Sequence, residues 1–196
     1  MSSPPDAPDF SLVLGASALV REEGLVHQPL FPGAPDDVPV AVLLEDEEAI
    51  DGERLDALGI AIDDAFAAAI EDLEDRDAGW IEQSIPVKGG GTLRIAARSG
   101  DEAGAEDALL PDALNDAAEL LSCKALAVAM PAPGTLLVTD ADQKWQLVAA
   151  FAAAAKMHHA DAGEDGLYAG ILRAEGGRIT GVIELRTASL DAASKS

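Results

Sequence analysis

The chain has 196 residues, of which 48% are hydrophobic and 25% charged, a globular composition with room for one substantial core in one or at most two domains. Asp and Glu number 36 against 13 Lys and Arg, which gives a net charge of −23. A field of that sign repels phosphates and anionic membranes and attracts cations, so we expect no direct binding to nucleic acid or to a membrane.

The single cysteine, Cys123, excludes an internal disulfide and a cysteine-based zinc cluster. The first ten residues have neither a basic start nor an apolar core, so they do not resemble a signal peptide. The longest apolar run, Leu147 to Ala155, is far shorter than the ~20 residues that span a bilayer. We therefore expect a soluble, cytoplasmic protein.

The amino-terminal third predicts two strands. Residues 1–8 are rich in Pro and Ser and are expected to be disordered. Phe10 to Leu14 reads as a short strand, and the prolines of the following stretch, up to Asp37, predict an irregular loop. Val38 to Leu44 is continuously apolar, which favours a strand buried on both faces.

Two helices follow. Leu55 and Leu58 fit a short helical turn that Gly59 is placed to end. Asp63 resembles the N-cap of a second helix, whose apolar face is formed by Phe66, Ile70 and Leu73.

The end of that second helix is acidic. Glu71, Asp72, Glu74 and Asp75 crowd its carboxyl end, where the helix dipole prefers cations by ~0.3–1 kcal/mol per group, and only Arg76 offsets them. Local helix stability does not explain these acids. We attribute them to solubility or to a partner.

The rest of the chain predicts two hairpins, two further strands and two further helices. Around a glycine turn, Trp80–Val87 and Thr92–Ala97 form the first hairpin, and Leu167–Ala174 with Arg178–Arg186 forms the second.

Between the two hairpins, Pro111 opens a helix with an apolar face at Leu114, Ala117, Ala118 and Leu121. The strands Ala125–Met130 and Thr135–Val138 flank a turn at Pro131–Gly134. A capping box of Thr139 and Asp142 then leads into a long apolar helix that ends near His159.

This mixture predicts an α+β fold, a mainly antiparallel sheet with two to three helices packed on one face. We expect a single domain over residues 9–186 and a flexible carboxyl-terminal tail over residues 187–196.

The segment from Val40 to Ala160 resembles the YtpQ-like family of uncharacterised bacterial proteins. The resemblance lies in Gly59-Ile60 leading into DDAFAAAIEDL, in the strand pair WIEQSIPV and TLRIAA, and in AVAMPAPGTLLVTDAD before a helix. It rests on the order and spacing of elements over somewhat more than half of the chain. It implies no known activity and supplies no catalytic residue.

The residues that could bind a metal or a ligand, or act in catalysis, are better explained by structural roles. His158 and His159 are adjacent, whereas helical metal ligands recur three or four residues apart, so they read as cations at a helix end. Cys123 precedes an apolar strand and reads as a small hydrophobe rather than a nucleophile. Four acids, Asp140, Asp142, Glu164 and Asp165, lack the spacing of a calcium loop. The two tryptophans, Trp80 and Trp145, are expected in packing rather than as ligand platforms.

We therefore predict a non-enzymatic module that recognises a basic protein partner through an acidic surface, for example a secretion-accessory chaperone or an immunity-type inhibitor. No cofactor or metal is expected, and self-association as a homodimer is left open. The alternatives are a small enzyme of unrecognised class, a mimic of nucleic acid, and a domain whose acidity serves solubility alone. The predicted contact residues are Glu45, Asp46, Glu47, Glu48, Glu71, Asp72, Glu74 and Asp75.

Overall fold

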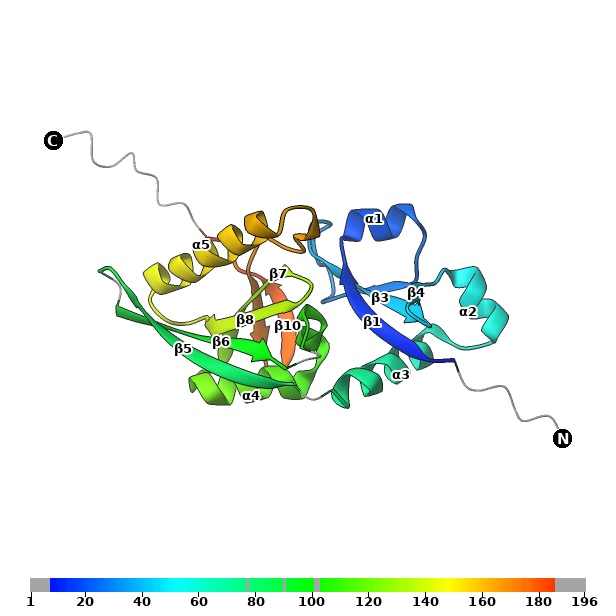
Figure 1. The fold of residues 1–196 in the computed structure, drawn as a ribbon, viewed down its shortest axis with the longest axis horizontal. Coiled ribbons are helices and arrows are strands. Elements are labelled where there is room, and N and C mark those ends of the chain that lie inside the picture. Colours follow the sequence, from blue (N-terminus) through cyan, green and yellow to red (C-terminus); the bar gives the residue numbers. More distant parts are fainter. Residues whose placement is uncertain (1–7, 77, 90, 101–102, 186–196) are drawn as a thin grey trace.

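The computed structural model describes residues 8–76, 78–89, 91–100 and 103–185 and contains two antiparallel sheets with five α-helices (Figure 1). The predicted α+β class and its mainly antiparallel pairing are confirmed. The predictions for residues 1–7 and for the tail 187–196 lie outside the described residues. Within the described ranges, no helix combines the length and the apolar character that crossing a membrane requires.

The smaller sheet has the strand order β1-β3-β2, with β4 paired to β3. The predicted strands around Phe10 and Val40 both form, but the irregular loop predicted up to Asp37 is wrong in part, because it contains a helix and a strand. That helix buries Val20 against β3, and that strand pairs with β3, so tertiary contacts rather than local pattern create both. The elements of this part are β1 (Phe10–Gly15), α1 (Ser17–Glu22), β2 (His27–Pro29), β3 (Val40–Glu45), β4 (Glu48–Ala49), α2 (Gly52–Leu58) and α3 (Ile62–Glu74).

The larger sheet has six strands in the order β10-β9-β7-β8-β6-β5. Both predicted hairpins are present, at β5–β6 and at β9–β10, and the paired strands β7 and β8 lie where the sequence places them. The elements are β5 (Gly79–Val87), β6 (Gly91–Ser99), the 3₁₀ helix η1 (Ala105–Leu109), α4 (Pro111–Leu121), β7 (Ala125–Ala132), β8 (Thr135–Asp140), α5 (Trp145–Ala162), the 3₁₀ helix η2 (Gly163–Asp165), β9 (Leu172–Glu175) and β10 (Arg178–Val182).

Helices cover both faces of the larger sheet, whereas the sequence suggested one covered face. Along β7, Leu126 and Val128 belong to the cluster that includes α4, and Ala127 and Ala129 belong to the cluster that includes α5. Figure 1 shows the two helices on opposite sides of the sheet. The cause is the composition of β7, in which successive residues are apolar and so require cover on both faces.

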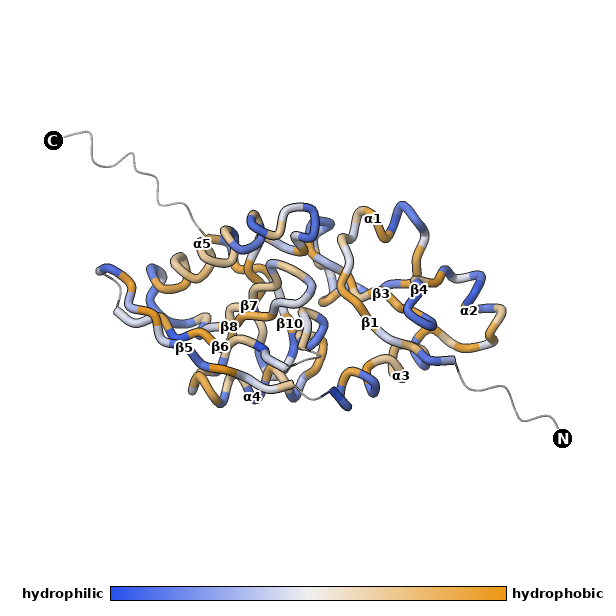
Figure 2. The backbone as a smooth tube through the Cα atoms, viewed as in Figure 1, coloured by the Kyte–Doolittle hydropathy of each residue, from blue (hydrophilic) through white to orange (hydrophobic). Residues whose placement is uncertain are grey.

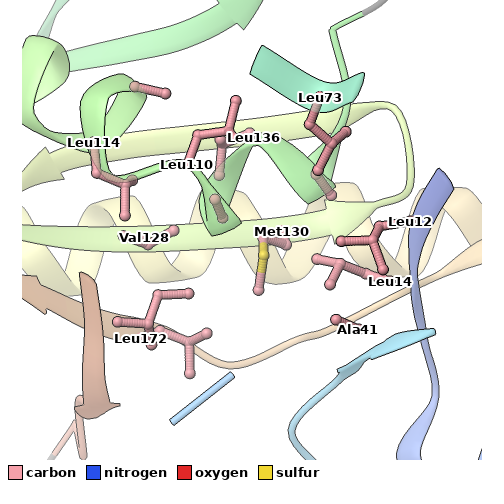
Figure 3. Packing of buried hydrophobic residues seen from close by; sticks show 14 of the residues in the cluster. Leu12, Leu14, Ala41, Leu73, Leu110, Leu114, Val128, Met130, Leu136 and Leu172 are labelled. Atoms are coloured by element: carbon pink, nitrogen blue, oxygen red, sulfur yellow. The ribbon is translucent and has the colours of Figure 1, made fainter. Parts of the chain in front are cut away.

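One hydrophobic cluster is continuous between the two sheets. Met130, which has no exposed surface, lies near the end of β7 and belongs to the same cluster as Leu12 and Ala41 of the smaller sheet. Figure 3 shows Met130 with Leu12 and Leu14 on one side and Leu110 and Leu136 on the other. The two sheets therefore share buried surface.

Two predicted helix caps are wrong and one helix end is confirmed. The helix containing Asp63 starts after Ala61, so Asp63 lies in its first turn. The capping box is wrong because Thr139 is buried in β8, where its hydroxyl donates to the carbonyl of Arg94. Gly59 ends α2 as expected, with φ of 69°, a left-handed conformation that costs glycine little.

The two tryptophans differ. Trp80 is half-buried against the main cluster, and its indole N–H donates to the carbonyl of Ala113 at 2.9 Å, as expected for a packing residue. Trp145 is 65% exposed at the start of α5, so the expectation of packing is wrong there. It lies beside Val148 and Ile183 in a surface groove. The buried face of α5 is formed instead by Leu147, Val148, Phe151, Ala152 and Ala155.

Candidate functional site

The first acidic segment, Glu45–Glu48, forms the turn between β3 and β4. Glu45 is buried and accepts two hydrogen bonds from the Arg54 guanidinium, both at 2.6 Å. These bonds hold the pKa of the Glu45 carboxyl below its usual range. Glu45 therefore serves the fold, whereas its neighbours Asp46, Glu47 and Glu48 are exposed.

The second acidic segment, Glu71–Asp75, is the last turn of α3 and its C-cap. Figure 2 shows α3 changing from hydrophobic to hydrophilic toward this end. Leu73 is buried, whereas the four acids are exposed. Asp72 lies 3.9 Å from Arg76, and Arg76 is held more closely by Glu106 at 2.8 Å. The one cation predicted to offset these acids is thus mainly engaged elsewhere.

A groove of about 650 Å³ runs beside α3, along the β2 edge of the smaller sheet. Its wall and floor are mostly apolar, and three carboxylates of α3 stand along it. Glu71 and Glu74 are neighbours one turn apart, and Asp63 lies two turns earlier. The groove is lined by Leu12, Gln28, Pro29, Leu30, Ala41, Asp63, Phe66, Ala67, Ile70, Glu71, Glu74 and Leu109.

The groove carboxylates stand outside the ion pairs that the described residues form. None of the ion pairs among the described residues includes Asp63, Glu71 or Glu74. Asp63 and Glu71 are both exposed, and they stand beside the buried Phe66 in the lining of the groove. The groove therefore combines an apolar floor with a negative rim.

The structure brings together only part of the predicted contact set. Glu71 and Glu74 share the groove, whereas Glu45, Asp46 and Glu48 line a separate, smaller depression of about 350 Å³ together with Arg54. Asp63 was missed as a site residue because its position at a helix start reads as a cap. A helical projection could have found it, since Asp63, Glu71 and Glu74 lie close to one side of the helix.

One further acid among the described residues lies inside the fold and is paired. Asp107 of η1 has no exposed surface and accepts a hydrogen bond from Arg98 Nε at 2.8 Å. The Arg98 guanidinium also lies over the Trp80 ring, 5.4 Å from its centre, which is within range of a cation–π contact. This pair joins η1 to β6 at the junction of the two sheets.

The groups considered for chemistry stay apart. Burial raises the pKa of the Cys123 thiol, and the nearby charges of Asp140 and Asp142 raise it further, which disfavours a reactive thiolate. Within the described part of the chain, no three His, Cys, Asp or Glu side chains gather as a metal site would require. Asp142 instead accepts hydrogen bonds from Arg173 at 3.0 Å.

Compared with protein-family models, with curated proteins and with solved structures, the chain gives no significant match in any of the three. The site must therefore be interpreted from its own geometry and charge.

Proposed function

We propose that this protein is a non-enzymatic binding module whose α3 groove receives a basic segment of a partner protein. The observation that supports this most directly is the set of Asp63, Glu71 and Glu74, none of which has an ion pair among the described residues, above an apolar floor. A segment with lysine or arginine side chains on one side and apolar side chains on the other would complement both features. Burial of its apolar side chains would supply affinity, and the carboxylates would supply orientation and a fast approach.

The placement of the acids supports a partner over solubility alone. Acids for solubility need only be exposed, and many positions on this surface would serve. Glu71 and Glu74 instead lie at a carboxyl helix end, where a negative charge opposes the helix dipole. The unfavourable interaction of these two charges with the helix dipole is explained if both face a cation in a complex.

The test compares the wild type with two variants that lose the same three negative charges. The groove variant carries Asp63→Asn, Glu71→Gln and Glu74→Gln. The turn variant carries Asp46→Asn, Glu47→Gln and Glu48→Gln, all on the separate acidic turn. Each protein is immobilised and exposed to a native lysate at low salt, and bound proteins are released at about 0.5 M salt, where the screening length is only a few ångströms.

We expect the wild type and the turn variant to retain the same basic protein in stoichiometric amount, and the groove variant to lose it. Equal loss from both variants would show that general acidity, rather than the groove, attracts the protein. Retention by all three proteins would show that the groove carboxylates are not involved.

A further inference from the structure

Strand β5 is an edge of the larger sheet. It has nine residues, Gly79–Val87, and among the described strands it pairs only with β6. The other edge strands among the described residues are shorter: β1 has six residues, β2 has three, β4 has two, and β10 has five with a register irregularity after Ile179. β5 carries Pro86 near its carboxyl end, and the stretch before it, Gly79 to Ile85, is the longest described edge that could template another strand.

Two isoleucines on β5 are exposed on one face. Ile81 is 52% exposed and Ile85 is 44% exposed. Their cross-strand partners on β6 are Ala97 and Leu93, and Leu93 is buried in the cluster that contains α5. Both isoleucines therefore stand on the α5 side of the sheet, beyond the cover that α5 provides. In Figure 2, β5 shows two hydrophobic stretches separated by a hydrophilic one.

The sequence of β5 is self-complementary around Gln83. In an antiparallel pair of two copies centred there, Ile81 faces Ile85 of the partner subunit, and Glu82 faces Ser84 of the partner subunit. A centre at Glu82 would instead oppose two like charges, and a centre at Ser84 would oppose Ile85 to a glutamine. Matched apolar pairs stabilise a sheet and opposed like charges destabilise it, so the Gln83 centre is favoured.

Charge also favours contact at this hairpin. Residues 79–99 contain Lys88, Arg94 and Arg98 and one acid, Glu82, a net charge of +2 in a chain of −23. Glu82 is itself neutralised by the Arg94 guanidinium, at 2.5 and 3.1 Å. Two copies therefore repel each other less at this hairpin than across their acidic surfaces.

We propose that β5 pairs antiparallel with β5 of a second copy, centred on Gln83, so that two six-stranded sheets join into one. The twofold axis makes the contact self-complementary and closed, as in most homodimers. The dimer contact does not involve the α3 groove, so it stands or fails independently of the proposed function. One strand pair with two apolar contacts per copy is a small interface, and we expect association at roughly micromolar concentration.

Cysteine cross-linking tests the register. In a Cys123→Ser background, Gln83→Cys places each new thiol directly opposite its copy, within the ~4.4–6.8 Å between Cα atoms that a disulfide needs. Ser84→Cys is the matched control, because position 84 is equally exposed but faces position 82 of the partner subunit. We expect mild oxidation to link the first variant and not the second. Equal linking of both, or linking of neither, would overturn the proposed register.

Sedimentation of the full chain up to about 200 μM tests the dimer itself. We expect the wild type to dimerise and the double variant Ile81→Lys, Ile85→Lys to remain monomeric with an unchanged circular dichroism spectrum. Val13→Lys is the control, since Val13 is 39% exposed on β1, an edge of the other sheet, and should leave the dimer intact. A monomeric wild type, or a lysine variant that still dimerises, would overturn the proposal.

Discussion

Acids inside the fold and acids along the α3 groove differ in burial and in ion pairing. Glu45 and Asp107 are buried, and each is held by an arginine. Glu71 and Glu74 are exposed beside an apolar groove and have no ion pair among the described residues. With only 13 basic residues against 36 acids, the placement of the arginines, more than the density of acids, separates the charges that serve the fold from those without an ion pair in the described part of the chain.

The largest expected effect is at the buried pair of Arg98 and Asp107. Arg98→Leu would leave a fully buried carboxylate without its partner, and we expect it to lower the free energy of unfolding by about 3–5 kcal/mol in urea denaturation. The double variant Arg98→Leu, Asp107→Leu should recover most of that loss. A loss below about 1 kcal/mol in the single variant would show that the Arg98 pair contributes no more than an exposed ion pair does, which would contradict its structural role.

The Glu45 pair should make stability depend on pH. Because Arg54 lowers the pKa of Glu45 in the folded state, the unfolded carboxyl takes up a proton at higher pH than the folded one does. The stabilisation is therefore present above the unfolded pKa of about 4.3 and is lost as pH falls through the folded value. In unfolding measurements from about pH 6 to 3, the wild type should lose more stability than Glu45→Gln. Parallel curves would contradict the pairing.

A smaller effect is expected in the exposed turn. Glu47 has a φ of 68°, in the left-handed region that disfavours residues with a side chain. Glu47→Gly should raise the free energy of unfolding by about 0.5–1 kcal/mol, since relief of that conformation exceeds the added entropy of the unfolded chain. Thermal unfolding would measure it, with Glu48→Gly as a control that should not stabilise.

The smallest expected effect is on the free energy of unfolding when a groove charge is removed. Glu71→Gln and Glu74→Gln each remove a charge that opposes the dipole of α3, so each should leave stability unchanged or raise it by about 0.3 kcal/mol. Chemical denaturation would show this. A loss above about 1 kcal/mol from either change would mean that the open acids also support the fold.

The sequence predicts those elements whose signals are local. The glycine turns of both hairpins, the apolar run of β3 and Gly59 after α2 are found where pattern and turn chemistry place them. The short strand β2 is not predictable, because only its pairing with β3 defines it. The groove is equally unpredictable from the sequence. Its walls combine Leu12, Leu30 and Leu109 with α3, and only the fold brings these residues together. For the same reason, the sequence could not separate Glu45, which is paired with Arg54, from Glu71 and Glu74, which line the groove.

The central claim, that the α3 groove takes a basic and apolar segment, is tested most directly by nuclear magnetic resonance. A synthetic peptide of alternating lysine and leucine residues would be titrated into the isotope-labelled wild type, the groove variant and the turn variant. We predict chemical-shift changes centred on α3 and β2, with binding weakened about tenfold in the groove variant and about twofold or less in the turn variant. Equal weakening in the two variants, or shift changes spread over the whole surface, would contradict the account.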